Sequence, residues 1–329
     1  MSQELDVVAI GNALVDVLSH ADDDFLKRHG VGKGTMCLIG PEKAEQLYSE
    51  MGPAVEISGG SAANTVAGLA SLGGKAAFIG KVADDQLGAI FRHDIRAQGV
   101  VFESKPAPKG GAPTGRCMII VTPDAQRTMQ TCLGSAGNVA PTDVDESLIQ
   151  RAKVTYLEGY LWDTPLAKKA YIRAAELAHA AGRKVALTLS DKFCVDRHLR
   201  DFQDLVEGHI DILFANEEEI KALCEVSSFD AALPAIKGKC EIAVLTRSEK
   251  GAVIVNAGAP VKVAAEPVTK LVDTTGAGDL FAAGFLYGYT RDMELARCGR
   301  IAAICAAEVI SHVGARPEVS LSAFVEQRL

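Results

Sequence analysis

The sequence predicts an α/β fold in which a mostly parallel sheet is covered by helices and a smaller β-sheet lies beside it. Along most of the 329 residues, short apolar runs alternate with helical patterns, which is typical of parallel sheets. Two regions break this alternation and carry shorter, β-rich pieces. The strand-like runs of the main sheet are Val7–Ile10, Ala76–Ile79, Val154–Leu157, Val185–Leu187, Ile210–Phe214, Ile242–Leu245 and Ala252–Val255.

The helices between these runs are predicted from apolar periodicity and from glycine stop signals. The helix over Ala62–Leu72 ends at Gly73-Gly74, and the helix over Pro165–Ala181 ends at Gly182. Three further helices are predicted over Asn216–Leu223, Gly276–Tyr287 and Met293–Ile310. Ligands of open parallel sheets bind beyond the carboxyl ends of the strands, so we expect the site there.

Two irregular regions are predicted to form the smaller sheet. Residues 12–58 carry strand-like runs near Val15–Ser19 and Thr35–Ile39. Residues 100–132 carry a predicted hairpin of Gly115–Val121 and Arg127–Cys132. The alternative is that these pieces are ordinary edge strands. We predict a core domain of residues 1–11, 59–99 and 133–329, and a β-rich lid of residues 12–58 and 100–132.

The composition argues against several classes of protein. An apolar content of 48% supports a sizeable core, and a net charge of −8 argues against nucleic acid or an anionic membrane as partner. The eight cysteines form no Cys-x-x-Cys pair and have mostly apolar neighbours, which favours reduced cysteines in a cytoplasmic protein. The run Val7–Ile10 is too short for a signal peptide, and no stretch approaches the roughly 18 apolar residues of a membrane span.

The segment Asp273-Thr274-Thr275-Gly276-Ala277-Gly278-Asp279 carries the strongest chemical signal in the chain. The bare N–H groups of a helix start bind anions, and Gly276 and Gly278 allow a ligand to approach the backbone. An acid beside an anion site is unusual because like charges repel. Asp279 therefore suggests a carboxylate placed to accept a proton where a phosphate is bound. The alternative is a plain glycine-rich turn in which Asp279 only complements the helix dipole.

The two commonest nucleotide signatures are missing from the chain. A dinucleotide fingerprint would need glycine at position 281, where Phe281 stands. A P-loop needs Gly-Lys followed by Ser or Thr, and no Gly-Lys pair in the sequence is followed by either residue.

A second glycine motif, Ser58-Gly59-Gly60-Ser61-Ala62-Ala63-Asn64-Thr65, opens the first long helix. The Gly59-Gly60 pair allows a ligand to lie against the backbone, and Asn64 offers a donor and an acceptor that suit sugar hydroxyls. Asn12 and Asp16, which follow the first strand, could add an amide and a carboxylate. Each of these pieces alone also fits a purely structural role.

Together the motifs resemble the PfkB (ribokinase-like) family of carbohydrate and nucleoside kinases. The Gly59-Gly60 segment with Phe78-Ile79-Gly80-Lys81-Val82-Ala83-Asp84-Asp85-Gln86-Leu87-Gly88 is similar to the family's N-terminal signature, and residues 273–279 are similar to its C-terminal one. Asn216-Glu217-Glu218-Glu219 matches the Asn-x-x-Glu element between them. The resemblance implies a three-layer α/β/α core with a β-sheet lid, and transfer of the γ-phosphoryl group of ATP to an alcohol.

The resemblance also implies the roles of single residues. Asp279 would be the base that accepts the hydroxyl proton. Asn216 and Glu219 would organise Mg²⁺ through water, and Asp273 and Thr275 would hold a monovalent cation such as K⁺. The anion hole would consist of the backbone N–H groups of Gly276, Ala277, Gly278 and Asp279.

The nucleotide-binding residues follow from the same matching. Thr246 and Gly251 match the nucleotide loop that follows a strand, although Ser248 stands where the family usually has glycine. Arg127, on the predicted hairpin, matches an arginine that reaches the phosphates. The alternative for Arg127 is a solvated turn residue.

The acceptor is predicted from the segments around the glycine pair. Ser61-Ala62-Ala63 and the segment from Asn12 to Asp16 are similar to family members that phosphorylate adenosine. Tyr160 and Phe193 match positions that line the nucleoside base there, although packing after strand ends also explains them. The ribose would be held by Asn12, Asp16, Gly59, Gly60 and Asn64.

Three alternatives stay open beside an adenosine-phosphorylating enzyme. A kinase of the same family for a free sugar such as ribose or fructose has the same motifs. A catalytically silent nucleotide sensor would use the same fold, and a dehydrogenase is disfavoured by the missing fingerprint. The expected partner is a small nucleoside or sugar, and the chain is expected to be a monomer or a homodimer.

Overall fold

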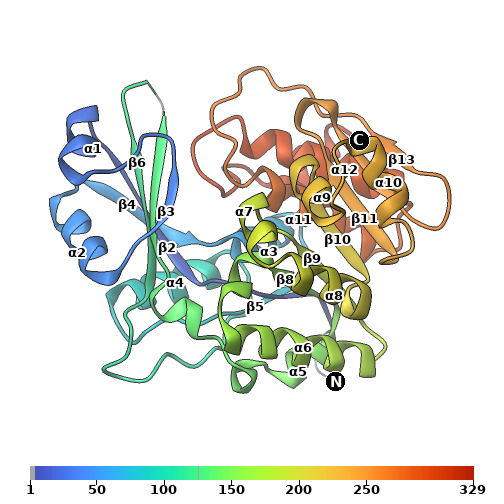
Figure 1. Ribbon diagram of the computed structural model, residues 1–329, viewed down its shortest axis with the longest axis horizontal. Helices are drawn as coiled ribbons and strands as arrows, with labels where there is room; N and C mark the ends of the chain where they lie inside the picture. The colour runs from blue at the N-terminus through green and yellow to red at the C-terminus, as the bar shows by residue number, and fades with distance from the viewer. Residues whose placement is uncertain (1–3, 125) are drawn as a thin grey trace.

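The computed structural model describes residues 4–124 and 126–329 and contains two β-sheets with helices around them (Figure 1). We call them the eight-stranded sheet A and the five-stranded sheet B. The predicted α/β class, with a large, mostly parallel sheet and a smaller second sheet, is confirmed. Residues 1–3 of the predicted core segment and Ala125 of the predicted hairpin turn lie outside the described residues. The predicted domain boundaries stay a prediction.

Sheet A has the strand order β13-β12-β11-β10-β9-β8-β1-β5. Its strands are parallel from β5 to β11, whereas β12 and β13 run antiparallel at one edge. The predicted strand positions are confirmed with ends shifted slightly, and β13 was not predicted. The strands are β1 (Leu5–Ile10), β5 (Ala76–Ile79), β8 (Ala152–Glu158), β9 (Lys184–Thr188), β10 (Ile212–Asn216), β11 (Ile242–Thr246), β12 (Ala252–Val255) and β13 (Val261–Val263).

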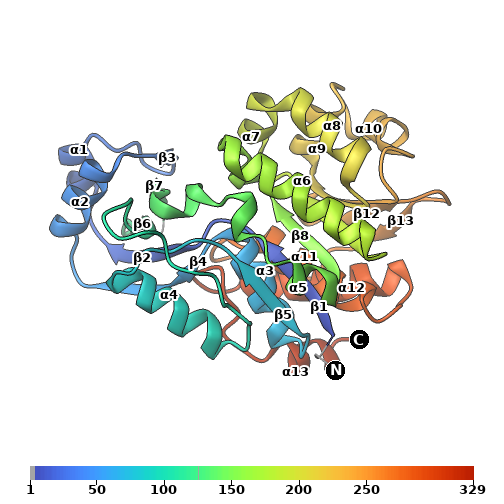
Figure 2. The ribbon, with the colours of Figure 1, turned by 90° about the horizontal axis from the view of Figure 1, so that it is seen from below.

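Helices cover both faces of sheet A (Figure 2). Within the described residues, no helix combines the length and the apolar character that a membrane span needs. One face carries α3 (Ser61–Ser71), α4 (Gln86–Ala97), α11 (Ala277–Tyr289), α12 (Leu295–Val309) and α13 (Leu321–Glu326). The other face carries α5 (Glu146–Arg151), α6 (Pro165–Ala180), α7 (Lys192–Arg197), α8 (Leu199–His209), α9 (Glu217–Leu223) and α10 (Phe229–Ile236).

Strand β1 shows why the strands of sheet A are apolar without interruption. Val7 and Ala9 pack in the same hydrophobic cluster as α3 and α11. Val8 and Ile10 point to the opposite face and pack in the cluster of α5 and α6. Because successive side chains of a strand alternate between faces, a strand covered on both sides needs apolar residues at every position.

Sheet B and its two helices form the part of the molecule that we call the lid. Its strand order is β3-β7-β6-β2-β4, and the predicted β6–β7 hairpin is confirmed. The segment 12–58 is less β-rich than predicted, because it contains the helices α1 and α2. Phe25 of α1 and Leu47 of α2 pack against Met118 and Ile120 on the outer face of sheet B. The elements are β2 (Leu14–His20), β3 (Met36–Leu38), β4 (Ala54–Gly59), β6 (Gly115–Val121), β7 (Arg127–Cys132), α1 (Asp23–His29) and α2 (Pro41–Glu50).

Helices α3 and α11 pack closely against each other. A Cβ atom on Gly68 of α3 would lie 2.5 Å from Cδ1 of Leu280 and 3.0 Å from Cβ of Ala283, both on α11. Glycine at this position therefore lets the two helices approach each other closely. This packing fixes the first turns of both helices relative to each other.

Candidate active site

The predicted site residues gather at the carboxyl edge of sheet A. Strand β1 ends just before Asn12, β8 ends at Glu158, β10 ends at Asn216 and β11 ends at Thr246. These parallel strands end at the same edge of the sheet, and the lid lies beside this edge (Figure 1). The position agrees with the general location of ligand sites in open α/β sheets.

The start of α11 is an uncapped helix N-terminus. Gly276 precedes the helix with a left-handed φ of 79° and, as a glycine, has no side chain with which to cap the first turn. A Cβ atom on Gly276 would lie 2.8 Å from Cα of Ala315, so the position admits only glycine. Ala277 and Gly278 are the first two residues of the helix. N of Ala277 donates to the carbonyl oxygen of Thr274 at 3.2 Å, so the N–H groups of Gly278 and Asp279 and the positive end of the dipole are the features that suit an anion.

Asp279 is the third residue of α11, and the first turn of α3 holds its carboxylate. Ser61 Oγ donates to Oδ1 at 2.6 Å, and Asn64 Nδ2 donates to Oδ2 at 2.9 Å. Burial raises the pKa of Asp279 above its ordinary value, while these two hydrogen bonds and the charge of Arg316 oppose that rise. The structure thus brings Asp279 and Asn64 together and adds Ser61, which the sequence analysis treated only as part of a motif.

The glycine pair lies against the other predicted ribose ligands. A Cβ atom on Gly59 would lie 2.4 Å from Cγ of Asp16, and one on Gly60 would lie 2.1 Å from the carbonyl oxygen of Asn12. Gly60 also has a left-handed φ of 97°. Burial raises the pKa of Asp16 to about 6, although the charge of Arg316 acts in the opposite direction. The two glycines therefore allow Asn12 and Asp16 to sit at the start of α3.

Glu158 is a buried carboxyl group at the site that lies in none of the sequence motifs. Its Oε1 accepts hydrogen bonds from Nδ2 of Asn12 at 2.7 Å and from N of Asn12 at 3.3 Å, and its Oε2 accepts from N of Ala62 at 2.9 Å. Burial raises the pKa of Glu158 to about 7, and these hydrogen bonds only partly oppose it. The available signal was an acid at the end of an apolar strand, followed directly by Gly159.

Two amide oxygens at the site are buried without a hydrogen-bond partner in the described part of the chain. They are Oδ1 of Asn12 and Oδ1 of Asn64. The Nδ2 atoms of the same amides donate hydrogen bonds to Glu158 and Asp279, which fixes the direction in which each amide oxygen points. Buried acceptors of this kind are normally satisfied, and a ligand with hydroxyl groups would satisfy both.

Arg127 joins the lid to the loop before α11. Its Nη1 lies 2.6 Å from Oδ2 of Asp273 and donates to Oγ1 of Thr275 at 3.4 Å. Oδ2 of Asp273 also accepts from N of Gly314, and Oδ1 accepts from N and Oγ1 of Thr275. Both carboxylate oxygens of Asp273 thus face donors in this structure. The predicted monovalent-cation site stays a prediction.

Asn216 and Glu219 form a reciprocal capping box at the start of α9. Oε2 of Glu219 accepts from N of Asn216 at 2.9 Å and Oε1 accepts from its Nδ2, while Asn216 Oδ1 accepts from the N–H groups of Glu218 and Glu219. Burial raises the pKa of Glu219 to about 7. Among residues 4–124 and 126–329, no group of three or more His, Cys, Asp or Glu side chains could hold a metal. The residues fit Mg²⁺ that takes its ligands from phosphates and water.

The predicted nucleotide loop follows β11. Thr246 pairs with Asn216 across the β10–β11 ladder, so these two predicted residues are neighbours. Gly251 has a φ of 81°, and its Cβ atom would lie 2.0 Å from the carbonyl oxygen of Val263. Ser248 has a left-handed φ of 51°. This conformation favours glycine, which explains why the family usually has glycine at this position.

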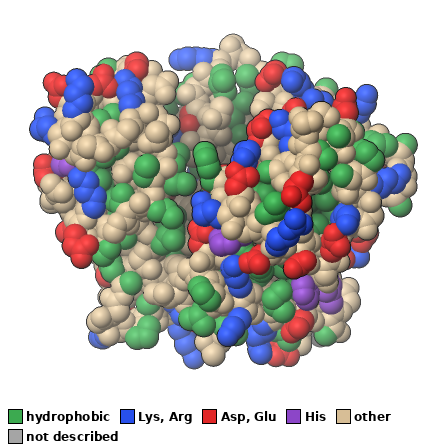
Figure 3. Space-filling model, in the orientation of Figure 1, with side chains coloured by type: hydrophobic (Ala, Val, Ile, Leu, Met, Phe, Trp, Pro, Cys, Tyr) green, Lys and Arg blue, Asp and Glu red, His purple; other side chains and the backbone are tan. Residues whose placement is uncertain are grey.

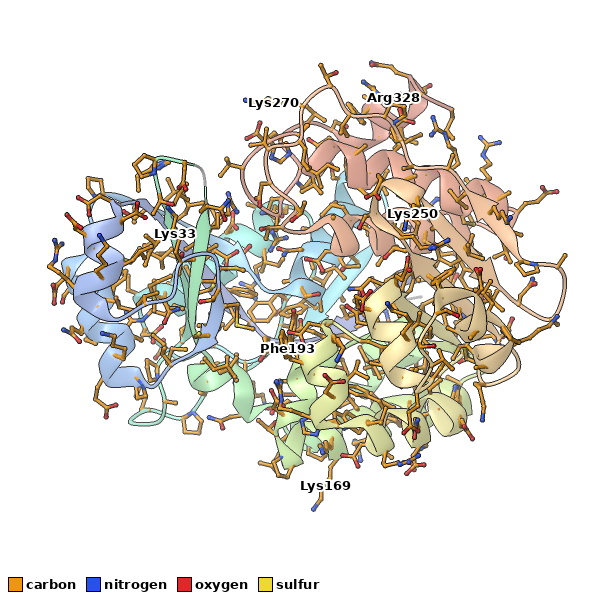
Figure 4. The ribbon with its side chains drawn as sticks, turned by 45° about the horizontal axis from the view of Figure 1, so that its top comes forward. Lys33, Lys169, Phe193, Lys250, Lys270 and Arg328 are labelled. Carbon is orange, nitrogen blue, oxygen red and sulfur yellow. The ribbon has the colours of Figure 1, made fainter. Side chains whose placement is uncertain are left out.

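The two predicted base-lining aromatics differ in their surroundings. The hydroxyl of Tyr160 donates to the carbonyl oxygen of Ser190 at 3.3 Å, and its N donates to Oγ of Ser190 at 3.1 Å. Phe193 on α7 is 73% exposed and lies on the side of the core next to the lid (Figure 4). That a base lies between Tyr160 and Phe193 stays a prediction.

The inner face of the lid carries apolar side chains. Leu18, Ile119 and Met129 are neighbours across β2, β6 and β7 on the face that α1 and α2 do not cover. Met36 is 43% exposed and Leu38 is 54% exposed on the neighbouring β3. Figure 3 shows the molecule hollowed between lid and core, with hydrophobic side chains on the lid side.

Comparison with known proteins shows a match along most of the chain. Residues 32–321 match the family model described as pfkB family carbohydrate kinase. Among curated proteins, adenosine kinase 2 of Arabidopsis thaliana is 25% identical over 337 residues, with 94% of each chain covered.

Two solved structures are similar over nearly the whole chain. The adenosine kinase from Sinorhizobium meliloti is 52% identical with a TM-score of 0.92, and the match covers 99% of this chain and 100% of that one. A probable sugar kinase from Rhizobium etli CFN 42 is 50% identical with a TM-score of 0.92, and the match covers 99% of both chains.

Proposed function

Because the chain belongs to the pfkB family of carbohydrate kinases, we propose that it transfers the γ-phosphoryl group of ATP to a ribose hydroxyl of adenosine. The observation that carries this proposal is the Asp279 carboxylate, which shares an uncapped helix start with Gly276 and is gripped by the first turn of α3. Phosphoryl transfer needs a positioned base and an electropositive site for the phosphate, and this helix start offers both.

In this proposal Asp279 accepts the proton of the acceptor hydroxyl as the hydroxyl oxygen attacks the γ-phosphorus of ATP, and ADP leaves as the bond to its bridging oxygen breaks. The hydrogen bonds from Ser61 and Asn64 orient the carboxylate and favour its ionised form. Its raised pKa brings its basicity closer to the operating pH than that of an exposed aspartate. The charge that develops on the transferred group is stabilised by the N–H groups of Gly276, Ala277, Gly278 and Asp279.

The acceptor is proposed to be a nucleoside because the site has a polar part that suits a ribose and an apolar part that suits a base. The partnerless amide oxygens of Asn12 and Asn64, with the Asp16 carboxylate, are suited to ribose hydroxyls. Gly59 and Gly60 allow the ribose to lie against these groups. The apolar inner face of the lid and the exposed Phe193 ring suit a flat nucleobase, which a free sugar lacks.

The nucleotide is proposed to bind between the lid and the loop after β11. Arg127 would exchange its contact with Asp273 for the phosphates, and Thr246 and Gly251 would contact the nucleotide. Bound Mg²⁺ would supply positive charge that neutralises the charge on the phosphates. Asn216 and Glu219 would orient its water ligands. All eight cysteines are free thiols, which supports a reducing, cytoplasmic setting.

Initial rates of ADP formation test this function with adenosine, ribose and fructose as acceptors. We expect adenosine to give the highest kcat/KM, by roughly 10- to 100-fold, since stacking of a base contributes about 1–3 kcal/mol. A higher kcat/KM with ribose or fructose would instead favour the sugar-kinase alternative, which the similarity to the Rhizobium protein supports. Absence of ADP release with every acceptor would contradict a kinase altogether.

The metal requirement is tested in the same assay. Excess EDTA should abolish turnover, and excess Mg²⁺ should restore it. Full turnover in EDTA would contradict the proposed role of Asn216 and Glu219.

A further inference from the structure

Arg316 lies in the loop between α12 and α13, where no sequence motif draws attention to it. Its guanidinium nevertheless reaches the start of α3. Nη1 donates to the carbonyl oxygen of Ala63 at 2.8 Å and to Oε1 of Gln98 at 3.0 Å. Nη2 donates to the carbonyl oxygen of Ser58 at 2.9 Å and to its Oγ at 3.0 Å, and Nε donates to the same carbonyl at 3.2 Å.

The two carbonyl groups that Arg316 binds lie on either side of the glycine pair. Ser58 immediately precedes Gly59, which ends β4 and contacts Asp16. Ala63 lies between Ser61 and Asn64, whose side chains hold Asp279. The planar guanidinium of Arg316 therefore binds both ends of the segment between β4 of the lid and α3. Helix α3 is the helix that holds the proposed base, Asp279.

A half-buried carboxylate supports the same segment. Oδ2 of Asp94 on α4 accepts from N of Ser58 at 2.8 Å, from Oγ of Ser58 at 2.5 Å and from Nε2 of Gln98 at 3.3 Å. Ser58 is thus held between an arginine and an aspartate through charge-assisted hydrogen bonds. This arrangement leaves little freedom for the backbone that leads into α3.

We propose that Arg316 is a positioning residue for phosphoryl transfer, which fixes residues 58–64 against Asp279 and supplies a positive charge beside the acids of the site. This inference rests on the proposed kinase function. It does not depend on which alcohol is the acceptor, because the segment serves any hydroxyl that Asp279 deprotonates.

Arg316 is the positive group of the C-terminal loop that faces Asp279 and Asp16, and its charge lowers the pKa of both. The groups that face Asp279 from the other elements are acidic or neutral, so loss of the arginine charge would raise the pKa of Asp279. These groups are Asp16 of β2, Tyr156 and Glu158 of β8, and Tyr160 of the short turn after β8.

Two substitutions separate the charge of Arg316 from its hydrogen-bond geometry. Arg316→Gln removes the charge, so we expect kcat/KM to fall by roughly 10²-fold and the acidic limb of its pH profile to move to higher pH. Arg316→Lys keeps the charge but cannot span both carbonyl groups. We expect its acidic limb to stay at the wild-type pH while KM for the acceptor rises by about tenfold.

Arg291→Gln is the matched control. Arg291 donates to Oδ2 of Asp6 and to the carbonyl oxygen of Tyr287, at the opposite end of β1 from the site. Its replacement should lower the melting temperature while KM and the pH profile stay unchanged. If Arg316 had only a structural role, Arg316→Gln would also lower the melting temperature and leave KM and the pH profile unchanged. That result would overturn the proposal.

The outcomes also separate this proposal from the proposed substrate. If the wild-type protein phosphorylates a sugar rather than adenosine, the same variants are assayed with that sugar, and the Arg316 prediction stands or falls on their profiles. If Arg316→Gln does not fold, Arg316→Lys decides the matter. An unchanged KM in a folded Arg316→Lys protein would then refute the positioning role.

Discussion

Helices α9 and α11 both start at the carboxyl edge of sheet A and both have an acid as third residue, yet the two acids are used differently. Glu219 of α9 folds back on its own cap and accepts from N and Nδ2 of Asn216. The cap of α11 is Gly276, which has no side chain, and Asp279 is held instead by the side chains of a second helix.

The difference indicates when an acid at a helix start is available for chemistry. In α9 the cap and the acid satisfy each other, so the helix end is closed by its own residues. In α11 the cap is glycine, so the cap residue offers the first-turn N–H groups no side-chain acceptor. The same local pattern therefore gives a structural cap in one helix and a candidate catalytic centre in the other.

The strongest test of this contrast is Asp279→Asn. Asparagine keeps the shape of the side chain but cannot accept the hydroxyl proton, so kcat should fall by roughly 10²–10⁴-fold. Affinity for ATP, measured by titration calorimetry, should persist because the helix start is unchanged. An Asp279→Asn protein with kcat near that of the wild type would refute the base assignment.

The geometry of the α11 start is tested by Gly276→Ala. The added methyl group meets Ala315 and the left-handed φ is unfavourable for alanine, so we expect kcat to fall by about 10²-fold and the melting temperature to drop.

Gly278→Ala is the control, because a Cβ atom there meets no described atom within 4 Å. Its melting temperature should stay at the wild-type value. Wild-type kcat in Gly276→Ala would show that this helix start does not bind the transferred group.

The α9 side of the comparison is tested by Glu219→Gln. Glutamine cannot accept both hydrogen bonds from Asn216, so the free energy of unfolding should fall by about 1 kcal/mol. Loss of the carboxylate should also raise the Mg²⁺ concentration for half-maximal activity by roughly 10-fold. If stability falls while the Mg²⁺ titration is unchanged, Glu219 acts only as a cap.

A third helix start, that of α3, is capped by an acid from another element. Glu158 accepts from N of Ala62, and its pKa of about 7 lies above the ordinary value of 4.5. Because the folded state binds this proton more tightly, the contribution of Glu158 to stability is complete below the ordinary pKa and is lost as pH rises through 7. The free energy of unfolding of the wild-type protein should therefore fall by about 1 kcal/mol between roughly pH 6 and 8 because of Glu158, and Glu158→Gln should abolish this fall.

Denaturant unfolding at the two pH values measures this effect. The wild-type protein should lose more stability between them than Glu158→Gln does. Equal losses in both proteins would mean that Glu158 does not titrate in this range.

Local patterns were enough to predict much of the fold. The uninterrupted apolar runs of sheet A and the β6–β7 hairpin were predicted because burial on both faces and a short turn leave a clear signal. Helix α4 was not predicted, although Asp85 caps it by accepting from N of Gly88. Helices α1 and α2 are short, and their apolar residues are buried only by packing against sheet B, so their sequences alone give a weak helix signal.

The candidate site divides in the same way. Asp279 and Asn64 lie in glycine motifs that mark helix starts, so the sequence pointed to both. Glu158 and Arg316 act on partners that lie 146 and 258 residues away in the chain, and contacts of that range leave no local pattern. Only the folded chain could reveal them.

The close approach of α3 and α11 at Gly68 has a consequence for how such a protein can change. In the proposed kinase, Ser61, Asn64 and the Asp279 carboxylate that they hold would keep their positions relative to one another whatever the position of the lid. Mutations on the inner face of the lid are then expected to change which acceptor binds while proton transfer to Asp279 is unaffected. A single glycine between two helices thereby separates the evolution of substrate choice from the preservation of chemistry.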